Sequence, residues 1–265
     1  IQPSASDEGI PLGVALLAYY RSGGNKRHHM QSSYLGMDYK GKTDLEKFLE
    51  NTGLKYRKTN DREVAEFLSK GKVIARCHGA SEYGPRALGN RSILADPRCK
   101  NMREKVNMQI KHRESYRPFA PSCLAEYQKV YFDLEVEAPF MIIASKVKKK
   151  WRRILPAITH VDNSSRPQAV RKEQNESYYN LIKEFGEITG VYCLLNTSFN
   201  DNDEPIVETY KDAVRTMLKT NVDMLYIENY LVFPEYVGPT KININLGNDI
   251  KDMYSSSMND LIDPN

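Results

Sequence analysis

The stretch GASEYGPRALGNRSILADPR, residues 79–98, places arginines among glycines, prolines and short apolar runs. Its glycines allow tight turns and the close approach of a ligand to backbone N–H groups, and Pro85 makes the chain rigid just before Arg86. A guanidinium held in place in this way is a fork-shaped donor that fits phosphate or carboxylate. We therefore predict that Arg86 binds an anion.

Two further arginines of this stretch have two interpretations. Arg91 and Arg98 could join an anion site, or they could flank a short strand at residues 92–94, with Asp96 as an ion-pair partner. The setting of the motif leaves both interpretations open.

The surrounding sequence predicts a mixed α/β domain. Thr43-Asp44-Leu45-Glu46 is a capping box that opens a helix ending near Gly53, and Gly71 ends a second helix. The periodicity of apolar residues predicts helices at 43–53, 61–70, 100–110, 177–185 and 209–220, and strands at 73–75, 140–144, 154–161, 191–195 and 224–227. Because the later elements are not a simple βαβ series, we expect a twisted mixed sheet with packed helices.

Charge balance and cysteine spacing exclude several classes of protein. The 38 Lys and Arg residues against 34 Asp and Glu give a net charge of only +4, so any anion site must be local. The four cysteines form no C-x-x-C pair, which argues against a zinc ribbon or a disulfide framework and for buried thiols in a reducing compartment. No apolar run approaches the roughly 20 residues of a membrane span, and no secretory signal opens the chain. We therefore expect a cytoplasmic protein without a membrane partner.

The N-terminal residues predict that the chain was cut from a longer one. It begins at Ile1 without an initiator Met, and the apolar helix that starts near Ile10 has no obvious partner surface in the polar residues after it. The boundaries we expect are 1–22 for the residual end of a preceding domain, 23–41 for a linker, 42–237 for the main domain and 238–265 for a polar C-terminal tail.

Residues 194–200 (LLNTSFN) run from an apolar strand into hydroxyl and amide groups. Ser198 and Asn200 are two residues apart, so in an extended segment both side chains point to one face and can bind one ligand together. The alternative is a Ser or Asx turn that closes the strand. Further cations lie near the ends of predicted elements, at Lys111, Arg117 and Arg166.

Four motifs together resemble the C-terminal half of the O-carbamoyltransferases, which are nodulation-factor and antibiotic-tailoring enzymes. The motifs are GPRALGNRSIL at 84–94, YRPFAP at 116–121, NTSFN at 196–200 and EPIV at 204–207. The resemblance runs from about Ala5 to Val232. It implies a YrdC-like fold with a concave nucleotide-binding face, and Ser198-Phe199-Asn200 is similar to the Ser-x-Asn element of YrdC-type proteins that make carbamoyl adenylate.

The activity that this resemblance implies is the formation of carbamoyl adenylate from carbamoyl phosphate and ATP, with Mg²⁺ bridging phosphate oxygens. Two polyanions must then be brought together against their repulsion, which requires concentrated positive charge and no covalent nucleophile. The residues implied for the phosphates are Arg86, Lys111, Arg117 and Arg166, and those implied for the nucleotide or carbamoyl group are Ser198 and Asn200.

The resemblance also implies a missing N-terminal domain of the actin/Hsp70-like class, where a hydroxyl-bearing small molecule accepts the carbamoyl group. In the family, iron in that domain is held by an H-x-x-x-H pair and an Asp-x-Gly turn. Asp7-Glu8-Gly9 matches the turn, but this sequence contains no H-x-x-x-H, so Asp7 alone cannot hold iron. In this chain we expect Asp7 to cap the following helix. We expect that helix to lie against the domain, to pair with a second copy in a homodimer, or to be poorly ordered.

A non-catalytic YrdC-like module that binds RNA or a nucleotide is the alternative function. Residues 146–153 (KVKKKWRR) combine basic side chains with an aromatic one, as segments that grip a nucleic-acid backbone do. A solvated loop or hairpin is the competing interpretation of this short run. Arg86 and Ser198 together favour the enzyme, because binding a duplex would not need both.

Overall fold

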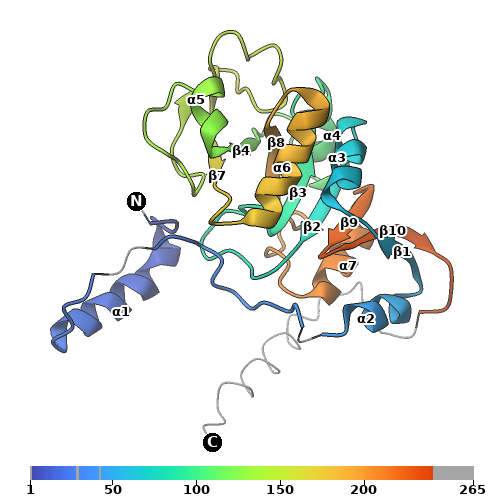
Figure 1. The fold of residues 1–265 in the computed structure, drawn as a ribbon, viewed down its shortest axis with the longest axis horizontal. Coiled ribbons are helices and arrows are strands. Elements are labelled where there is room, and N and C mark those ends of the chain that lie inside the picture. The colour runs from blue at the N-terminus through green and yellow to red at the C-terminus, as the bar shows by residue number, and fades with distance from the viewer. Residues whose placement is uncertain (1, 28–29, 42, 241–265) are drawn as a thin grey trace, which may run out of the picture.

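The computed structural model describes residues 2–27, 30–41 and 43–240. Their main feature is one large sheet with helices packed on it (Figure 1). Its strands are β1 (Leu54–Lys58), β2 (Ile74–Cys77), β3 (Arg91–Ala95), β4 (Ala120–Leu124), β7 (Gln168–Val170), β8 (Cys193–Ser198), β9 (Met224–Ile227) and β10 (Tyr230–Tyr236). They lie in the order β1-β10-β9-β2-β3-β8-β4-β7. The pairs β2/β9 and β4/β7 are parallel and the other neighbours are antiparallel. The predicted mixed sheet is confirmed.

Helices cover both faces of this sheet. On one face, α3 (Asp61–Ser69) packs against α6 (Glu176–Thr189) over an apolar core. On the other face, the core includes residues of α2 (Leu45–Thr52), α4 (Met102–Lys105) and α7 (Tyr210–Lys219). α4 continues directly into a π-helical turn, Val106–Ile110. A small lobe beside the sheet holds a 3₁₀ turn (Ala125–Tyr127), α5 (Gln128–Tyr131) and the hairpin of β5 (Ser145–Lys146) with β6 (Ser164–Ser165).

Local capping chemistry explains where most of these helices begin and end. The Asp44 side chain accepts a hydrogen bond from the backbone N–H of Lys47 at 3.1 Å, so Asp44 is the N-cap of α2 and the predicted capping box from Thr43 is wrong. Gly53 ends α2 with φ +70°, a conformation that glycine adopts without a steric penalty. Thr209 and Asp212 form a capping box that opens α7.

Two predicted strands are wrong. Residues 140–144 are irregular because Met141 has φ +54°, and Phe140 and Met141 pack with Leu88 in a small core of their own. Residues 154–161 form successive turns, in which the N–H of Ile158 donates to the carbonyl of Leu155 at 3.3 Å. Both stretches bury apolar side chains without strand pairing, so apolar content alone misled the prediction.

Six strands were not predicted, namely β1, β4, β5, β6, β7 and β10, and three of them show the reason. β1 reads LKYRK and lies at the edge of the sheet, where only one side chain is buried and no apolar alternation is required. β4 contains Pro121, a residue usually excluded from the middle of a sheet. β10 includes Pro234 in its exposed half. Proline and polar residues therefore hid these three strands.

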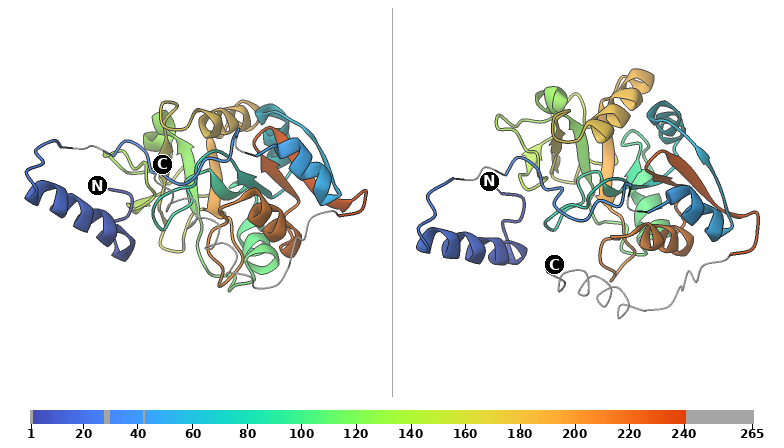
Figure 2. Two further views of the ribbon diagram at one scale, coloured as in Figure 1. Left: turned by 90° about the horizontal axis from the view of Figure 1, so that it is seen from below. Right: turned by 60° about the horizontal axis from the view of Figure 1, so that its bottom comes forward.

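The N-terminal helix α1 (Ile10–Arg21) extends away from the rest of the molecule (Figure 2). None of its residues is buried, and Ile10, Val14 and Leu17 expose half or more of their area. Its N-cap is Gly9 and no side chain caps it, so the predicted capping role of Asp7 is wrong. A 3₁₀ turn, Asp7–Gly9, precedes the helix.

Some expectations fall on residues outside those described. The C-terminal tail predicted for 238–265 lies outside them from residue 241 onward, as does residue 42, where the main domain was expected to begin. Within the described ranges, no helix has both the length and the apolar character that crossing a membrane requires.

Candidate functional site

One end of the sheet collects the segments that carry the predicted phosphate and nucleotide residues. β8 runs antiparallel to β3 and β4, so its carboxyl end lies beside their amino ends. β2 is antiparallel to β3, and β7 is parallel to β4, which brings the end of β2 and the start of β7 to the same place. The segments that meet there are 78–90 after β2, the approach to β4, residues 166–167 before β7 and residues 198–200 at the end of β8.

Lys111 bonds directly to both polar residues at the end of β8. Its Nζ donates to Asn200 Oδ1 at 2.5 Å, to the Asn200 carbonyl at 2.6 Å and to the Ser198 carbonyl at 3.0 Å. Ser198 Oγ lies 2.6 Å from Asn200 Oδ1, so these two side chains face the same side. The N–H of Asn200 also donates to the Ser198 carbonyl at 3.2 Å, so the strand closes here in a tight turn as well.

The backbone before Lys111 aims its side chain at this strand end. The N–H of Lys111 donates to the Val106 carbonyl at 2.9 Å, the five-residue spacing of a π-helical turn, and such turns are frequent at functional sites. The residue is only 3 % exposed. Burial, followed by the positive charge of Arg113, lowers the pKa of Lys111 to about 7. The buried position therefore disfavours the charged form of Lys111.

Arg86 and Arg166 form a second group of positive charge at the same end of the sheet. Both side chains are half-buried, and the Nε atom of each is buried without a hydrogen-bond partner. Burial, followed by the charge of Arg86, lowers the pKa of Arg166 to about 10. No carboxylate pairs with either guanidinium among the described residues. Two crowded cations without a counter-ion are the arrangement that an anion would complete.

An open groove of about 560 Å³ is lined by residues that are close in sequence to Lys111 and Asn200, among them His112 and Asn202. Arg117 lines it with a half-exposed side chain whose nearest carboxylate oxygen, on Glu114, is 3.8 Å away. Arg113 also lines it, and its guanidinium lies 4.9 Å from the ring centre of Phe119. The pKa of Arg113 is lowered by burial and then by Arg117. The groove therefore holds two arginines whose charges are poorly compensated.

The structure places Arg91 and Arg98 outside this set. Arg98 Nη2 lies 2.7 Å from Asp96 Oδ2, so the ion-pair interpretation is confirmed. Arg91 is fully buried, and its Nη1 donates to the carbonyls of His78 and Gly79, both at 3.0 Å. Arg91 thus holds the backbone of the arginine motif in shape, although its Nη2 has no partner.

Sequence reasoning missed the residue that organises the Arg86 loop. Glu82 Oε1 accepts hydrogen bonds from the backbone N–H groups of Leu88 and Asn90, both at 2.7 Å. Burial raises the pKa of Glu82, while these N–H donors oppose the shift. The signal was an acidic residue inside a glycine-rich loop, where backbone N–H groups are free to converge on it.

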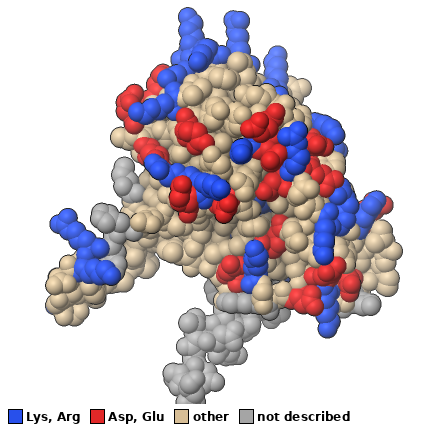
Figure 3. Space-filling model, in the orientation of Figure 1, with Lys and Arg blue, Asp and Glu red and all other residues tan. Residues whose placement is uncertain are grey.

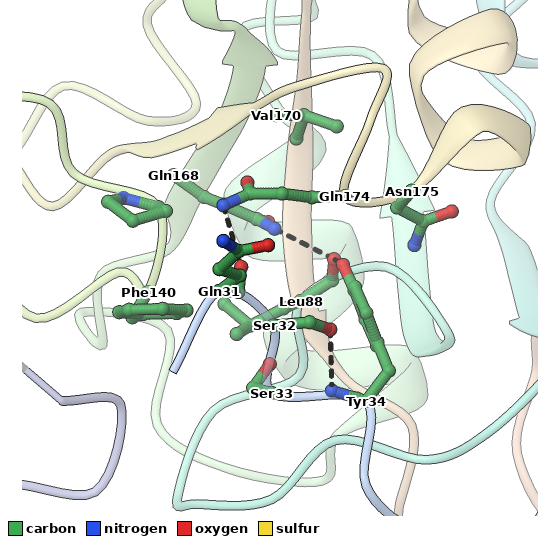
Figure 4. Close-up of a pocket in the computed structure, with 11 residues that line it drawn as sticks. Gln31, Ser32, Ser33, Tyr34, Leu88, Phe140, Gln168, Val170, Gln174 and Asn175 are labelled. Atoms are coloured by element: carbon green, nitrogen blue, oxygen red, sulfur yellow. Dashed lines mark hydrogen bonds between the residues drawn. The ribbon is translucent and has the colours of Figure 1, made fainter. Parts of the chain in front are cut away.

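Residues 31–36, which fall in the predicted linker, also support this loop (Figure 4). Tyr34 Oη donates to the Leu88 carbonyl at 2.9 Å, and Gln168 Nε2 donates to the same oxygen at 2.8 Å. The Tyr83 N–H donates to the Ser33 carbonyl at 2.6 Å. A pocket of only about 10 Å³ lies between residues 31–34 and β7. The loop that carries Arg86 is therefore held from two sides.

His78 and Glu228 lie beside the start of the same loop. His78 Nδ1 is 3.2 Å from Glu228 Oε2, but burial, followed by Arg76, lowers the pKa of His78 to about 2. The imidazole is therefore neutral and the contact is not an ion pair. Glu228 Oε1 accepts from the Gly79 N–H at 2.9 Å and from Tyr210 Oη at 3.1 Å, which anchors the end of β2.

The basic run at 146–153 is a hairpin and turn whose cations are partly engaged. Lys146 Nζ lies 3.3 Å from Asp162 Oδ2, and Lys148 Nζ donates to the Lys129 carbonyl at 2.6 Å. Trp151 packs edge-on against Tyr131, with ring centres 4.7 Å apart. Lys and Arg side chains are interspersed with Asp and Glu over the face drawn in Figure 3. The solvated-hairpin interpretation fits these contacts.

The described residues include neither a cluster of metal ligands nor a reactive thiol. Within them, no three His, Cys, Asp or Glu side chains gather closely enough to hold a metal ion. The four cysteines are free, and three of them, Cys77, Cys123 and Cys193, are buried. Burial raises the pKa of Cys77 to about 12, so this thiol is a core residue, as expected.

Together, these elements form a mixed α/β domain with several lysine and arginine side chains at one end of its sheet. Residues 65–233 match the family described as Carbamoyltransferase C-terminus, and the chain belongs to that family. It is 41 % identical to nodulation protein NolNO of Sinorhizobium fredii, covering 90 % of this chain and 36 % of that protein. It is 35 % identical to the 3'-hydroxymethylcephem-O-carbamoyltransferase of Amycolatopsis lactamdurans, covering 81 % and 40 % respectively. The chain thus spans well under half the length of these relatives.

Among solved structures, the chain is similar to full-length HypF in its phosphate- and nucleotide-bound form. The sequences are 18 % identical, the TM-score is 0.47, and the match covers 68 % of this chain and 26 % of that one.

Proposed function

We propose that this chain binds ATP and carbamoyl phosphate and forms carbamoyl adenylate, as the C-terminal part of an O-carbamoyltransferase. The observation that carries the proposal is the buried Lys111 beside Ser198 and Asn200, at the sheet end that also receives the loop of Arg86. Family membership supports the carbamoyl group as the cargo.

The proposed roles follow from the charges and contacts of each residue. Arg86 and Arg166 have no acidic partner in the described part of the chain, so they bind one phosphate group between them. Lys111 becomes a full ammonium when a second phosphate approaches the end of β8. Arg117 lies in the open groove and binds the outer phosphates of ATP. Cations fixed before the substrates arrive lower the repulsion between two polyanions.

Mg²⁺ would reach this site with the nucleotide. Mg²⁺ usually keeps several waters and is held by substrate phosphates with one or two carboxylates, so the lack of a carboxylate cluster in the described ranges suits that mode. In our proposal, iron and the hydroxyl-bearing acceptor belong to an N-terminal part that the longer relatives have, and Asp7 contributes to iron binding only in such a two-domain protein.

The same proposal assigns residues 1–22 to the end of that preceding part and residues 42–237 to a YrdC-like domain, in a cytoplasmic protein. The exposed apolar side chains of α1 support an interaction outside this domain, with the preceding part or with a second copy.

Carbamoyl-phosphate-dependent exchange of pyrophosphate into ATP tests this proposal. The wild-type chain should catalyse exchange, and Lys111→Met should lower it by about 100-fold, the effect of removing one preorganised charge contact. Lys129→Met is the matched control, because it removes an exposed lysine that pairs with Glu135. Exchange that is absent from the wild type, together with salt-sensitive RNA binding, would favour the non-catalytic module instead.

A further inference from the structure

Lys111 and His112 contact Asn200 and Asp201, respectively, beside the groove. His112 Nδ1 lies 2.8 Å from Asp201 Oδ1. The Lys111 contact already belongs to the proposed site. The His112 contact places an imidazole beside it that no role above uses.

Asp201 is a well-fixed carboxylate. Its side chain is 8 % exposed, its Oδ1 also accepts from the Asn202 N–H at 2.7 Å, and its Oδ2 lies 3.5 Å from Lys219 Nζ. Burial opposes ionisation, but the hydrogen bond from His112 and the other donors outweigh it and lower the pKa of Asp201. An ionised Asp201 can only accept, so His112 must carry a proton on Nδ1.

This arrangement leaves His112 Nε2 free at the groove. No hydrogen bond to Nε2 occurs among the described residues, and the side chain is 44 % exposed. The backbone of His112 has φ +43°, a region that non-glycine residues rarely adopt. Strain of this kind is often kept where it aims a side chain at a ligand.

Two arginines and two acidic residues line the groove around His112. Its other lining residues are Met108, Arg113, Glu114, Arg117, Asn202 and Asp203. Burial, followed by the charge of Arg117, lowers the pKa of Arg113, and Lys219 Nζ lies 3.5 Å from Asp201 Oδ2. Glu114 and Asp203 are the acidic residues on its wall. A polyphosphate bound in the groove would reduce the repulsion between Arg113 and Arg117 and would lie within reach of His112 Nε2.

We propose that His112 is a nucleotide-contacting residue that takes up a second proton as ATP binds, so that its Nε2–H donates to a phosphate oxygen in this groove while its Nδ1–H stays on Asp201, which fixes the ring. The inference deepens the proposed function and rests on it. His112 thus adds a contact next to Lys111, and Asp201 is a positioning residue that acts through the imidazole.

Two substitutions distinguish the contribution of His112 Nδ1 from that of His112 Nε2. His112→Asn keeps an amide where Nδ1 meets Asp201 but removes Nε2, whereas His112→Gln can place its amide near the Nε2 position. Binding of ATP and of inorganic triphosphate is measured by calorimetry on the full chain, with thermal unfolding in parallel. We expect His112→Asn to weaken both ligands about tenfold without a large change in melting temperature, and His112→Gln to recover most of the loss. His160→Asn, which removes an imidazole bonded to the Phe119 carbonyl outside this groove, is the control.

The outcomes distinguish the inference from the function on which it rests. If the wild type binds ATP and His112→Asn binds it equally well, His112 only joins two segments and the inference is wrong while the function stands. If the wild type binds triphosphate but not ATP, and His112→Asn loses triphosphate, the contact is real and the nucleotide is not the ligand. If the wild type binds neither anion, both are overturned.

Discussion

The guanidinium groups of Arg86 and Arg166 lie close enough for the charge of Arg86 to add to the effect of burial in lowering the pKa of Arg166. Neither group has an acidic partner among the described residues, and the Nε of each is buried without a hydrogen bond. The folded chain therefore keeps two positive charges together at a cost to its own stability. Such an arrangement favours binding of an anion over stability of the free protein.

Replacing Arg86 should change the stability of the free protein and its affinity for an anion in opposite directions. Arg86→Met removes the repulsion, so the ligand-free chain should be as stable as the wild type or more stable by about 0.5 kcal/mol, and the gain should shrink at high salt. Phosphate affinity should fall by about tenfold or more, because a charge-assisted contact is lost. Thermal unfolding and calorimetry check the two halves. A variant that loses stability and keeps its affinity would show that Arg86 is structural.

Arg117 offers a test of the groove alone. Arg117→Ala should weaken binding of carbamoyl phosphate by about 2 kcal/mol, the scale of one charge-assisted hydrogen bond. Its half-exposed side chain has only a distant carboxylate neighbour, so the melting temperature should hardly change. Equilibrium binding by calorimetry measures the loss. Unchanged affinity would remove Arg117 from the site.

The lowered pKa of Lys111 predicts how anion binding depends on pH. Between about pH 7 and its ordinary value of 10.5, the unfolded chain protonates Lys111 and the folded chain does not, so this group makes stability rise with pH. Anion binding needs the ammonium, so sulfate affinity should fall by up to about tenfold per pH unit above 7. Sulfate is the probe because it does not titrate in this range.

Lys111→Arg supplies the control for that pH profile, since arginine stays protonated throughout. If the variant binds sulfate at all, its affinity should be nearly flat from pH 7 to 9. The same slope in variant and wild type would mean that another group controls the titration.

Tyr34 should prove important for the shape of the Arg86 loop. Tyr34→Phe removes the hydrogen bond to the Leu88 carbonyl, and Gln168 still donates to the same oxygen. We expect a loss of about 1 kcal/mol in the free energy of unfolding, measured by urea denaturation. A loss near zero would show that residues 31–36 lie on the loop without supporting it.

The sequence predicted elements well where local chemistry decides them. β9 and α7 lie where the periodicity of apolar residues placed them, at 224–227 and 209–220. β4 was missed because Pro121 argues against a central strand, and residues 140–144 were misread because Met141 takes a left-handed conformation that no local signal announced. These outcomes depend on packing between distant segments.

In the candidate site, too, local sequence predicted some residues, whereas others depend on packing between distant segments. Glycines, prolines and strand ends marked Arg86, Ser198 and Asn200 in the sequence. The contact of Lys111 with the end of β8 depends on a π-helical turn, and the role of Glu82 depends on how its loop closes. His112 and Asp201 are separated by 89 residues, so no spacing rule could have paired them.

A crystal structure of this chain with a non-hydrolysable ATP analogue and inorganic phosphate tests the central claim most directly. The account predicts one phosphate between Arg86 and Arg166, and the nucleotide phosphates within hydrogen-bond distance, about 3 Å, of Lys111 Nζ. Ser198 or Asn200 should contact the nucleotide in the same complex. Anions bound elsewhere, with these side chains unchanged and unoccupied, would contradict the account.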